Sequence, residues 1–217
     1  MFFDARQPPF SANEPVVVKI GGSLTRQPEI LKAVLGIVDR APQPIVAVAG
    51  GGSFADAVRE AQRKFGFSHD TAHRMAILAM HQNALVMASV AGSLVPQESV
   101  SEVGAALASG NKAIWLPLKD CENDSDLPAT WDTTSDAIAA RLGERLGGLP
   151  VVFVKSRQPE TGNRDAQSLA AEGLIDPVSA LILERAGMAF TIVEAAQGAE
   201  LAGLLGLPAD VDADRLA

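Results

Sequence analysis

The chain has 217 residues, of which 47% are hydrophobic and 20% charged, and its formal net charge at pH 7 is −8. This composition is typical of a globular protein with a substantial core. The negative charge argues against a general nucleic-acid binder. No apolar run approaches the roughly 20 residues of a membrane-spanning helix, and residues 1–15 lack a secretory signal pattern. We therefore expect a cytoplasmic protein with neither nucleic acid nor membrane as a partner.

Residues 1–14 contain proline and asparagine without any periodicity. We expect them to form a flexible N-terminal arm ahead of a single domain over 15–217. Cys121 is the only cysteine of the chain, which excludes an internal disulfide and a cysteine-based zinc site.

The first strong pattern is an apolar run over 16–20 that enters the turn Gly21-Gly22-Ser23. The pattern recurs where the run over 45–49 enters Gly50-Gly51-Gly52-Ser53. β-Branched residues ahead of a glycine turn predict a buried strand. Glycine lets a ligand approach the backbone, and the next helix N-terminus offers unpaired N–H groups. Two such loops at the ends of neighbouring strands predict a site for two phosphoryl groups that face one another.

Helices and strands alternate along the rest of the chain. We expect helices over about 28–38, 54–65, 70–90, 99–109, 133–142, 177–187 and 198–205. We expect further strands over 112–117, 150–154 and 189–193, an acidic surface loop over 120–128, and no clear element over 156–172. Near-continuous apolar strands between helices predict an α/β fold, a three-layer αβα sandwich around a mainly parallel sheet.

Charged side chains are predicted at the same edge of the sheet as the glycine loops. Lys19 nearly adjoins the first turn, Lys155 follows the strand over 150–154, and Asp136 opens a helix. Phosphoryl transfer needs positioning of donor and acceptor and neutralisation of charge. The two lysines could supply that charge, and Asp136 could orient them or assist a bound Mg²⁺.

Each of these features also has a purely structural explanation. A Gly-Gly-Ser sequence can be only a tight turn, and a carboxylate at a helix start can simply interact with the helix dipole. His69, His73 and His81 do not predict a metal site, and His73 could be a substrate contact or a packed histidine. The chain contains no Walker-type loop, dinucleotide fingerprint or hydrolase nucleophile elbow.

Three segments together resemble the amino acid kinase superfamily. They are Val-Lys-Ile-Gly-Gly-Ser (18–23), Gly-Gly-Gly-Ser-Phe-Ala-Asp (50–56) and Thr-Ser-Asp-Ala-Ile-Ala-Ala (134–140). They occur in the family's order, and the resemblance spans about 15–195. It implies an amino acid kinase-like fold, with an acceptor-binding part at about 15–130 and a nucleotide-binding part at about 131–217.

Further segments resemble one branch of this family, the short kinases of methanogens and methylotrophs that act on (5-(aminomethyl)furan-3-yl)methyl phosphate. These segments are Phe-Ala-Asp-x-Val-Arg (54–59), Ala-His-x-Met-Ala-Ile-x-Ala-Met (72–80) and Trp-x-x-Thr-Ser-Asp (131–136). This resemblance implies a kinase that uses ATP and Mg²⁺ on a phosphate monoester, in the biosynthesis of methanofuran-type cofactors.

The resemblance, taken with the residues themselves, suggests a role for each candidate site residue. The catalytic candidates are Lys19, Asp136 and Lys155. The candidates for binding phosphate are Gly21, Gly22, Ser23, Gly50, Gly51 and Gly52. The candidates for binding the acceptor are Ser53, Asp56, Arg59 and His73. Arginine suits a phosphate because its planar fork can bind two oxygens.

One segment departs from the family pattern. The family usually has a sequence like Asp-Val-Asp-Gly-Ile-Tyr in its nucleotide pocket, where residues 155–162 here read Lys-Ser-Arg-Gln-Pro-Glu-Thr-Gly. Two alternatives therefore stay open: a kinase of an amino acid, a nucleotide or isopentenyl phosphate, and a non-catalytic member that binds a phosphorylated ligand. The family resemblance also implies a homodimer or higher symmetric oligomer, with the helix over 70–90 as the candidate interface.

Overall fold

A computed structural model describes residues 1–4, 11, 13–160 and 164–207 of the chain. Within these residues, six parallel strands form one sheet in the order β3-β4-β2-β1-β5-β6. The strands are β1 (Val16–Ile20), β2 (Ile45–Ala49), β3 (Val95–Gln97), β4 (Ala113–Trp115), β5 (Val151–Lys155) and β6 (Phe190–Glu194). The parallel sheet confirms the predicted α/β class.

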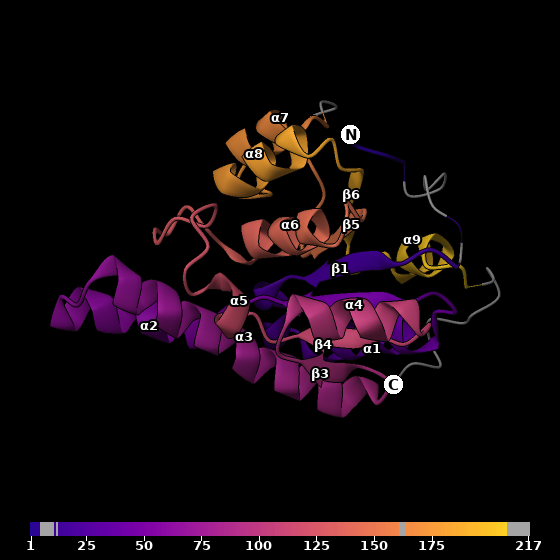
Figure 1. Cartoon of the computed structure of the whole chain (residues 1–217), viewed down its shortest axis with the longest axis horizontal. Helices are drawn as coiled ribbons and strands as arrows, with labels where there is room; N and C mark the ends of the chain where they lie inside the picture. Colours follow the sequence, from indigo (N-terminus) through magenta and orange to yellow (C-terminus); the bar gives the residue numbers. More distant parts are fainter. Residues whose placement is uncertain (5–10, 12, 161–163, 208–217) are drawn as a thin grey trace.

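Helices cover both faces of this sheet (Figure 1). They are η1 (Gly22–Arg26), α1 (Pro28–Arg40), α2 (Gly52–Phe65), α3 (His69–Ala91), α4 (Val100–Ala108), α5 (Leu118–Cys121), α6 (Ser135–Arg145), α7 (Ala166–Ala171), α8 (Pro177–Arg185) and α9 (Gly198–Leu204). Two apolar cores result, one on each face. The first contains side chains of α1, α9 and the C-terminal half of α3, and the second contains side chains of α4, α6, α7 and α8.

The central strands are apolar on both faces because both faces are buried. Every residue of β1 and β2 is buried, and the observed bounds of both strands match the predicted ones. Alternate residues of β1 enter different cores: Val16, Val18 and Ile20 the first, and Val17 the second. Lys19 therefore points to the same face as Val17, toward α6.

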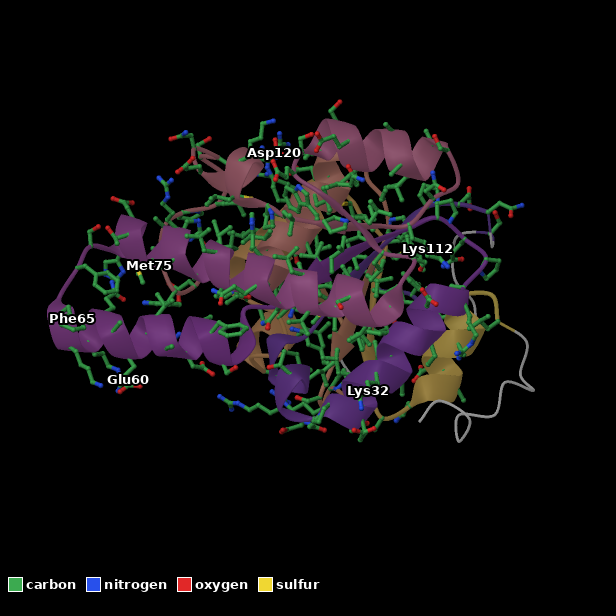
Figure 2. All side chains as sticks on the ribbon, turned by 90° about the horizontal axis from the view of Figure 1, so that it is seen from below. Lys32, Glu60, Phe65, Met75, Lys112 and Asp120 are labelled. Atoms are coloured by element: carbon green, nitrogen blue, oxygen red, sulfur yellow. The ribbon has the colours of Figure 1, made fainter. Side chains whose placement is uncertain are left out.

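Helix α2 and helix α3 form a long hairpin that extends beyond the sheet (Figures 1 and 2). Gly66 ends α2 with a left-handed backbone (φ 67°), and Ser68 caps the start of α3 by accepting a hydrogen bond from Thr71 N. Phe65 lies at the tip of the hairpin (Figure 2) and is 80% exposed.

The structure differs from the sequence-based predictions in several segments. Helix α7 lies within 156–172, where we expected no element, because Asp165 caps its first turn through Ser168. Strand β3 was missed because it is short, mostly exposed and contains Pro96. The first residues of the chain are held on the sheet rather than loose, since Phe2 forms a parallel bridge with Phe190 and Phe3 is buried.

The rest of the expected arm lies partly outside the described residues, at 5–10 and 12, and the division into arm and domain stays a prediction. The expected acidic loop over 120–128 begins inside the short helix α5. No helix of the described chain combines the length and the apolar character needed to cross a bilayer.

Candidate functional site

The carboxyl ends of β1, β2 and β5 meet at the centre of the sheet. Strand β1 pairs with β2 on one side and with β5 on the other. The strands that follow β1 in the sequence are therefore added first on one side of it and later on the other, which makes β1 the topological switch point of the sheet. Ligands of open α/β sheets bind at the carboxyl ends of the strands beside such a switch point. Both glycine loops and both lysine candidates belong to these three strands.

The two glycine loops lie in direct backbone contact. A Cβ atom on Gly22 would lie 2.3 Å from Gly52 N, and one on Gly50 would lie 2.3 Å from Gly22 N. Gly52 also has a positive φ of 51°, at the first position of α2. Any side chain at Gly22 or Gly50 would therefore force the loops apart.

Asn83 stabilises the second glycine loop through a buried hydrogen bond. Its side-chain Nδ2 donates a 2.7 Å hydrogen bond to Gly50 O, and the residue is only 3% exposed. Asn83 was not predicted from the sequence, although an asparagine among the apolar residues of the helix over 70–90 was a signal that could have identified it. A buried amide at such a position needs a partner.

The structure brings the three catalytic candidates together in one buried cluster. Asp136 lies in the first turn of α6 and is 5% exposed. Its Oδ1 is 2.9 Å from Lys19 Nζ, and its Oδ2 accepts a 2.6 Å hydrogen bond from Lys155 Nζ. The cluster forms because β1 and β5 are neighbours and both lysines face the start of α6.

Burial and charge act in opposite directions on this cluster. Burial alone would raise the pKa of the Asp136 carboxyl, but the positive charges of Lys155 and Lys19 hold that pKa below its ordinary value. Burial lowers the pKa of Lys155 from 10.5 to about 8, and Asp136 opposes this shift. Asp136 is therefore ionised at neutral pH, and Lys155 titrates about one pH unit above neutrality.

Both oxygens of Asp136 lie against ammonium groups, which fits the orienting role rather than the alternative role as a Mg²⁺ ligand. In the part of the chain that the structure describes, no three His, Cys, Asp or Glu side chains are grouped so as to hold a metal ion.

A cavity of about 290 Å³ opens beside the glycine loops. Seven of the predicted residues line it: Gly22, Ser23, Gly51, Gly52, Asp56, Arg59 and His73. The remaining candidates, Lys19, Gly21, Gly50, Ser53, Asp136 and Lys155, are not among its lining residues, and Ser53 is exposed to solvent. Thr134 and Ser135, which precede Asp136, line the cavity and connect it to the lysine cluster.

One wall of the cavity carries two guanidinium groups that share a single carboxylate. Asp56 accepts a 2.5 Å hydrogen bond from Arg26 and lies 3.4 Å from an Arg59 nitrogen. The Arg59 guanidinium stacks 4.3 Å from the centre of the Trp131 ring, and Trp131 Nε1 donates to Gln62 Oε1. Arg26 was not predicted from the sequence, because no local pattern links it to α2.

His73 faces the same cavity from α3. Its Nε2 is buried and has no hydrogen-bond partner among the described residues. Burial lowers the pKa of His73 below its ordinary value, and Asp70 opposes this effect, so the imidazole is neutral at pH 7. His81, in contrast, accepts a hydrogen bond from Leu118 N and has a structural role.

Comparisons with known proteins agree with this geometry. The model of the amino acid kinase family matches residues 14–157. The chain is 30% identical over 138 residues to [5-(aminomethyl)furan-3-yl]methyl phosphate kinase from Methanocaldococcus jannaschii, a match that covers 63% of each protein. It is 27% identical over 124 residues to acetylglutamate kinase from Colwellia psychrerythraea, which covers 57% of this chain and 44% of that enzyme. The chain thus spans less than two thirds of the length of either relative.

The fold is similar to the crystal structure of uridylate kinase from Archaeoglobus fulgidus. The TM-score is 0.65 at 16% sequence identity, and the superposition covers 88% of this chain and 96% of that one. The family match includes Lys19, Asp136 and Lys155 and ends within the segment that departs from the family pattern.

Proposed function

Because the chain belongs to the amino acid kinase family, we propose that it is an ATP-dependent kinase of a small acceptor that itself carries a phosphate group. The observation that carries this proposal is the cluster of Lys19, Asp136 and Lys155 at the carboxyl ends of β1 and β5, next to two glycine loops in backbone contact. Positive charge and free backbone amides are what a transferring phosphoryl group needs.

In the proposed reaction, an oxygen of the acceptor phosphate attacks the γ-phosphorus of ATP. The bond from this phosphorus to the bridging oxygen breaks, and ADP leaves with that electron pair. Lys19 and Lys155 stabilise the negative charge on the transferring group, and Asp136 keeps their two ammonium groups in place. Mg²⁺ enters with ATP, as part of the substrate.

A phosphate acceptor also suits the protonation states of the site. A phosphate monoester has its second pKa near 6, so it is already an anion at neutral pH and needs no general base. The Asp136 carboxylate is engaged by both lysines and is a poor proton acceptor, because its pKa is lowered. This chemistry favours a phosphate acceptor over a hydroxyl acceptor, which would have to lose a proton.

The charge of the cavity supports an anionic acceptor. Arg26 and Arg59 share the single carboxylate of Asp56, so this wall carries an excess positive charge. Backbone N–H groups at the start of α2 add a further attraction for anions. The cavity volume of about 290 Å³ lies near the lower end of the range of small-molecule sites.

Within this class, we propose (5-(aminomethyl)furan-3-yl)methyl phosphate as the acceptor, in the biosynthesis of methanofuran-type cofactors. The support is the name of the Methanocaldococcus relative together with the two arginines that line the cavity. The other acceptors, an amino acid, a nucleotide or isopentenyl phosphate, are separate arms of the test. The nucleotide-binding role of residues from about 131 onward is part of the same proposal.

The test is an ADP-release assay with Mg·ATP and a panel of acceptors that contains the furan phosphate and each alternative. We expect ADP release that depends on the furan phosphate. This release should fall by orders of magnitude in Lys19→Ala, because the variant removes the positive charge of the lysine that stabilises the transferring phosphoryl group. Lys32→Ala is the matched control, since Lys32 is exposed on α1 and pairs with Glu29 on the same helix (Figure 2). It should retain full activity.

Turnover on another acceptor alone would overturn the furan phosphate assignment. Binding of Mg·ATP or of the furan phosphate by calorimetry, with no turnover on any acceptor, would favour the non-catalytic alternative. The specific observation behind that alternative is the departure from the family pattern over 155–162.

A further inference from the structure

One carboxylate, that of Asp176, joins the starts of two helices. Asp176 caps α8, where its Oδ1 accepts a 2.6 Å hydrogen bond from Ser179 N. Its Oδ2 reaches across to α6 and accepts from Thr134 N at 3.1 Å, Thr134 Oγ1 at 2.6 Å and Ala137 N at 2.9 Å. The sequence predicted a helix over 177–187 but not the contact of Asp176 with α6.

Thr134 also links Asp176 to Asp136, because its hydroxyl oxygen forms hydrogen bonds with both residues. Thr134 is the N-cap of α6, and its Oγ1 accepts a 3.2 Å hydrogen bond from Asp136 N. A hydroxyl has one hydrogen, and an ionised carboxylate can only accept, so the Thr134 hydrogen points to Asp176. A lone pair of the same oxygen is thereby left facing the backbone N–H of Asp136.

Asp176 also balances the charge of the buried cluster. Lys19 and Lys155 carry two positive charges, and Asp136 supplies only one of the two negative charges needed to match them. Asp176 is 6% exposed and supplies the second. Burial raises the pKa of the Asp176 carboxyl and the charge of Asp136 adds to this, whereas the hydrogen bonds from Thr134, Ser179 and Ala137 oppose it.

Three charged groups act on Lys155 from the elements packed around it: Asp136 on α6, Lys19 on β1 and Asp176 at the start of α8. Glu194 is the register partner of Lys155 on β6. Asp176 favours the charged form of Lys155.

We propose that Asp176 is a positioning residue of the site: through Thr134 and Ala137 it holds the first turn of α6 so that Asp136 stays between the two lysines. This inference deepens the proposed function and rests on it, because it gives the cluster its role in phosphoryl transfer. A purely structural cap would stabilise α8 and leave the lysine cluster unaffected.

The experiment compares Asp176→Asn with Asp165→Asn, since both residues cap a helix through an i+3 serine and the Asp176 carboxylate also accepts a hydrogen bond from Ala137 of α6. The two readouts are kcat in the ADP-release assay and the pH midpoint of the Lys155 side chain, followed by NMR of carbon-13-labelled lysine and assigned with Lys155→Arg. A second pair, Thr134→Val and Thr134→Ser, removes or keeps the connecting hydroxyl while Asp176 remains.

We expect Asp176→Asn to lower kcat by about tenfold to a hundredfold, because a misplacement of roughly 1 Å can cost about 10²-fold. The Lys155 midpoint should also move to lower pH in this variant. Asp165→Asn should leave kcat and the midpoint unchanged. Thr134→Val should lower kcat, and Thr134→Ser should restore it.

Asp176→Asn with unchanged kcat and an unchanged Lys155 midpoint would show that Asp176 is only a cap. Equal losses in Thr134→Val and Thr134→Ser would also overturn the proposal, and this pair decides the matter if Asp176→Asn does not fold. If the wild type turns over no acceptor, the proposed function fails separately. The NMR midpoint then still supports or refutes the coupling between Asp176 and the cluster.

Discussion

Lys155 combines burial with direct contact to a carboxylate, and this combination gives it an unusual titration. Its Nζ lies 2.6 Å from Asp136 Oδ2, and burial lowers its pKa to about 8. The ammonium is therefore present below pH 8 and is lost as the pH rises above it. In the unfolded chain the same lysine keeps its proton to about pH 10.5. The unfolded state thus binds more protons between these two values, so the contribution of Lys155 to stability increases with pH in this window.

We expect kcat/KM for ATP to decrease as the pH rises through about 8, because this constant reports the titration of the free enzyme and Lys155 loses its charge there. Lys155→Arg should remove this alkaline limb, whatever its overall rate, since a guanidinium stays protonated. Lys112→Arg is the control: Lys112 is also partly buried with a lowered pKa, but it donates to Asp39 O at the other end of the sheet (Figure 2). An alkaline limb that persists in Lys155→Arg would refute the assignment.

At the scale of elements, the contact between the two glycine loops fixes how β1 and β2 end relative to each other. We expect Gly50→Ala to destabilise the fold by about 1–3 kcal/mol, since its Cβ would overlap Gly22 N at 2.3 Å and backbone atoms must shift. It should also lower kcat sharply. Gly104→Ala tests the same substitution within α4, where the nearest atom to a new Cβ would be Leu146 Cδ2 at 3.7 Å.

Chemical denaturation and the ADP-release assay measure both effects. Gly104→Ala should be neutral or slightly stabilising, because alanine suits a helix interior better than glycine. If Gly50→Ala were as stable and as active as the wild type, the close approach of the loops would not matter to the site.

The elements with strong local patterns were predictable from the sequence. The observed bounds of β1 and β2 match the predicted ones because both strands are continuous apolar runs. Strand β3 and helix α7 were missed, because a short exposed strand has no apolar run and a six-residue helix has too few turns to show a period.

The site residues also fall into those that could be predicted from the sequence and those that could not. Lys19, Asp136 and Lys155 could be proposed because each lies at the end of a recognisable element. Arg26 and Asp176 could not, since their partners Asp56 and Thr134 come from remote parts of the chain and only the folded arrangement brings them together.

At the scale of the whole molecule, one face of α3 is apolar and exposed although the opposite face is buried. Its exposed apolar side chains are Met75, Leu78, Leu85, Val86 and Val90, which are between 36% and 53% exposed. Three or four residues separate neighbours along a helix face, and Gln82 completes this row between Leu78 and Leu85. A stripe of this kind on a long helix is typical of a protein–protein interface.

We expect the protein to form a homodimer in which the α3 helices of two copies pack across a two-fold axis. Sedimentation equilibrium at micromolar concentration should give a dimer, and Leu85→Glu should give a monomer because it places a charge in the apolar contact. Leu181→Glu is the matched control, since Leu181 is 60% exposed on α8, outside the α3 stripe. The inner face of α3 lines the cavity through His73, Ile77 and Met80, so the dimer contact would also stabilise the proposed acceptor site. A wild-type monomer at these concentrations would refute the interface, and Leu85→Glu would then leave the acceptor KM unchanged.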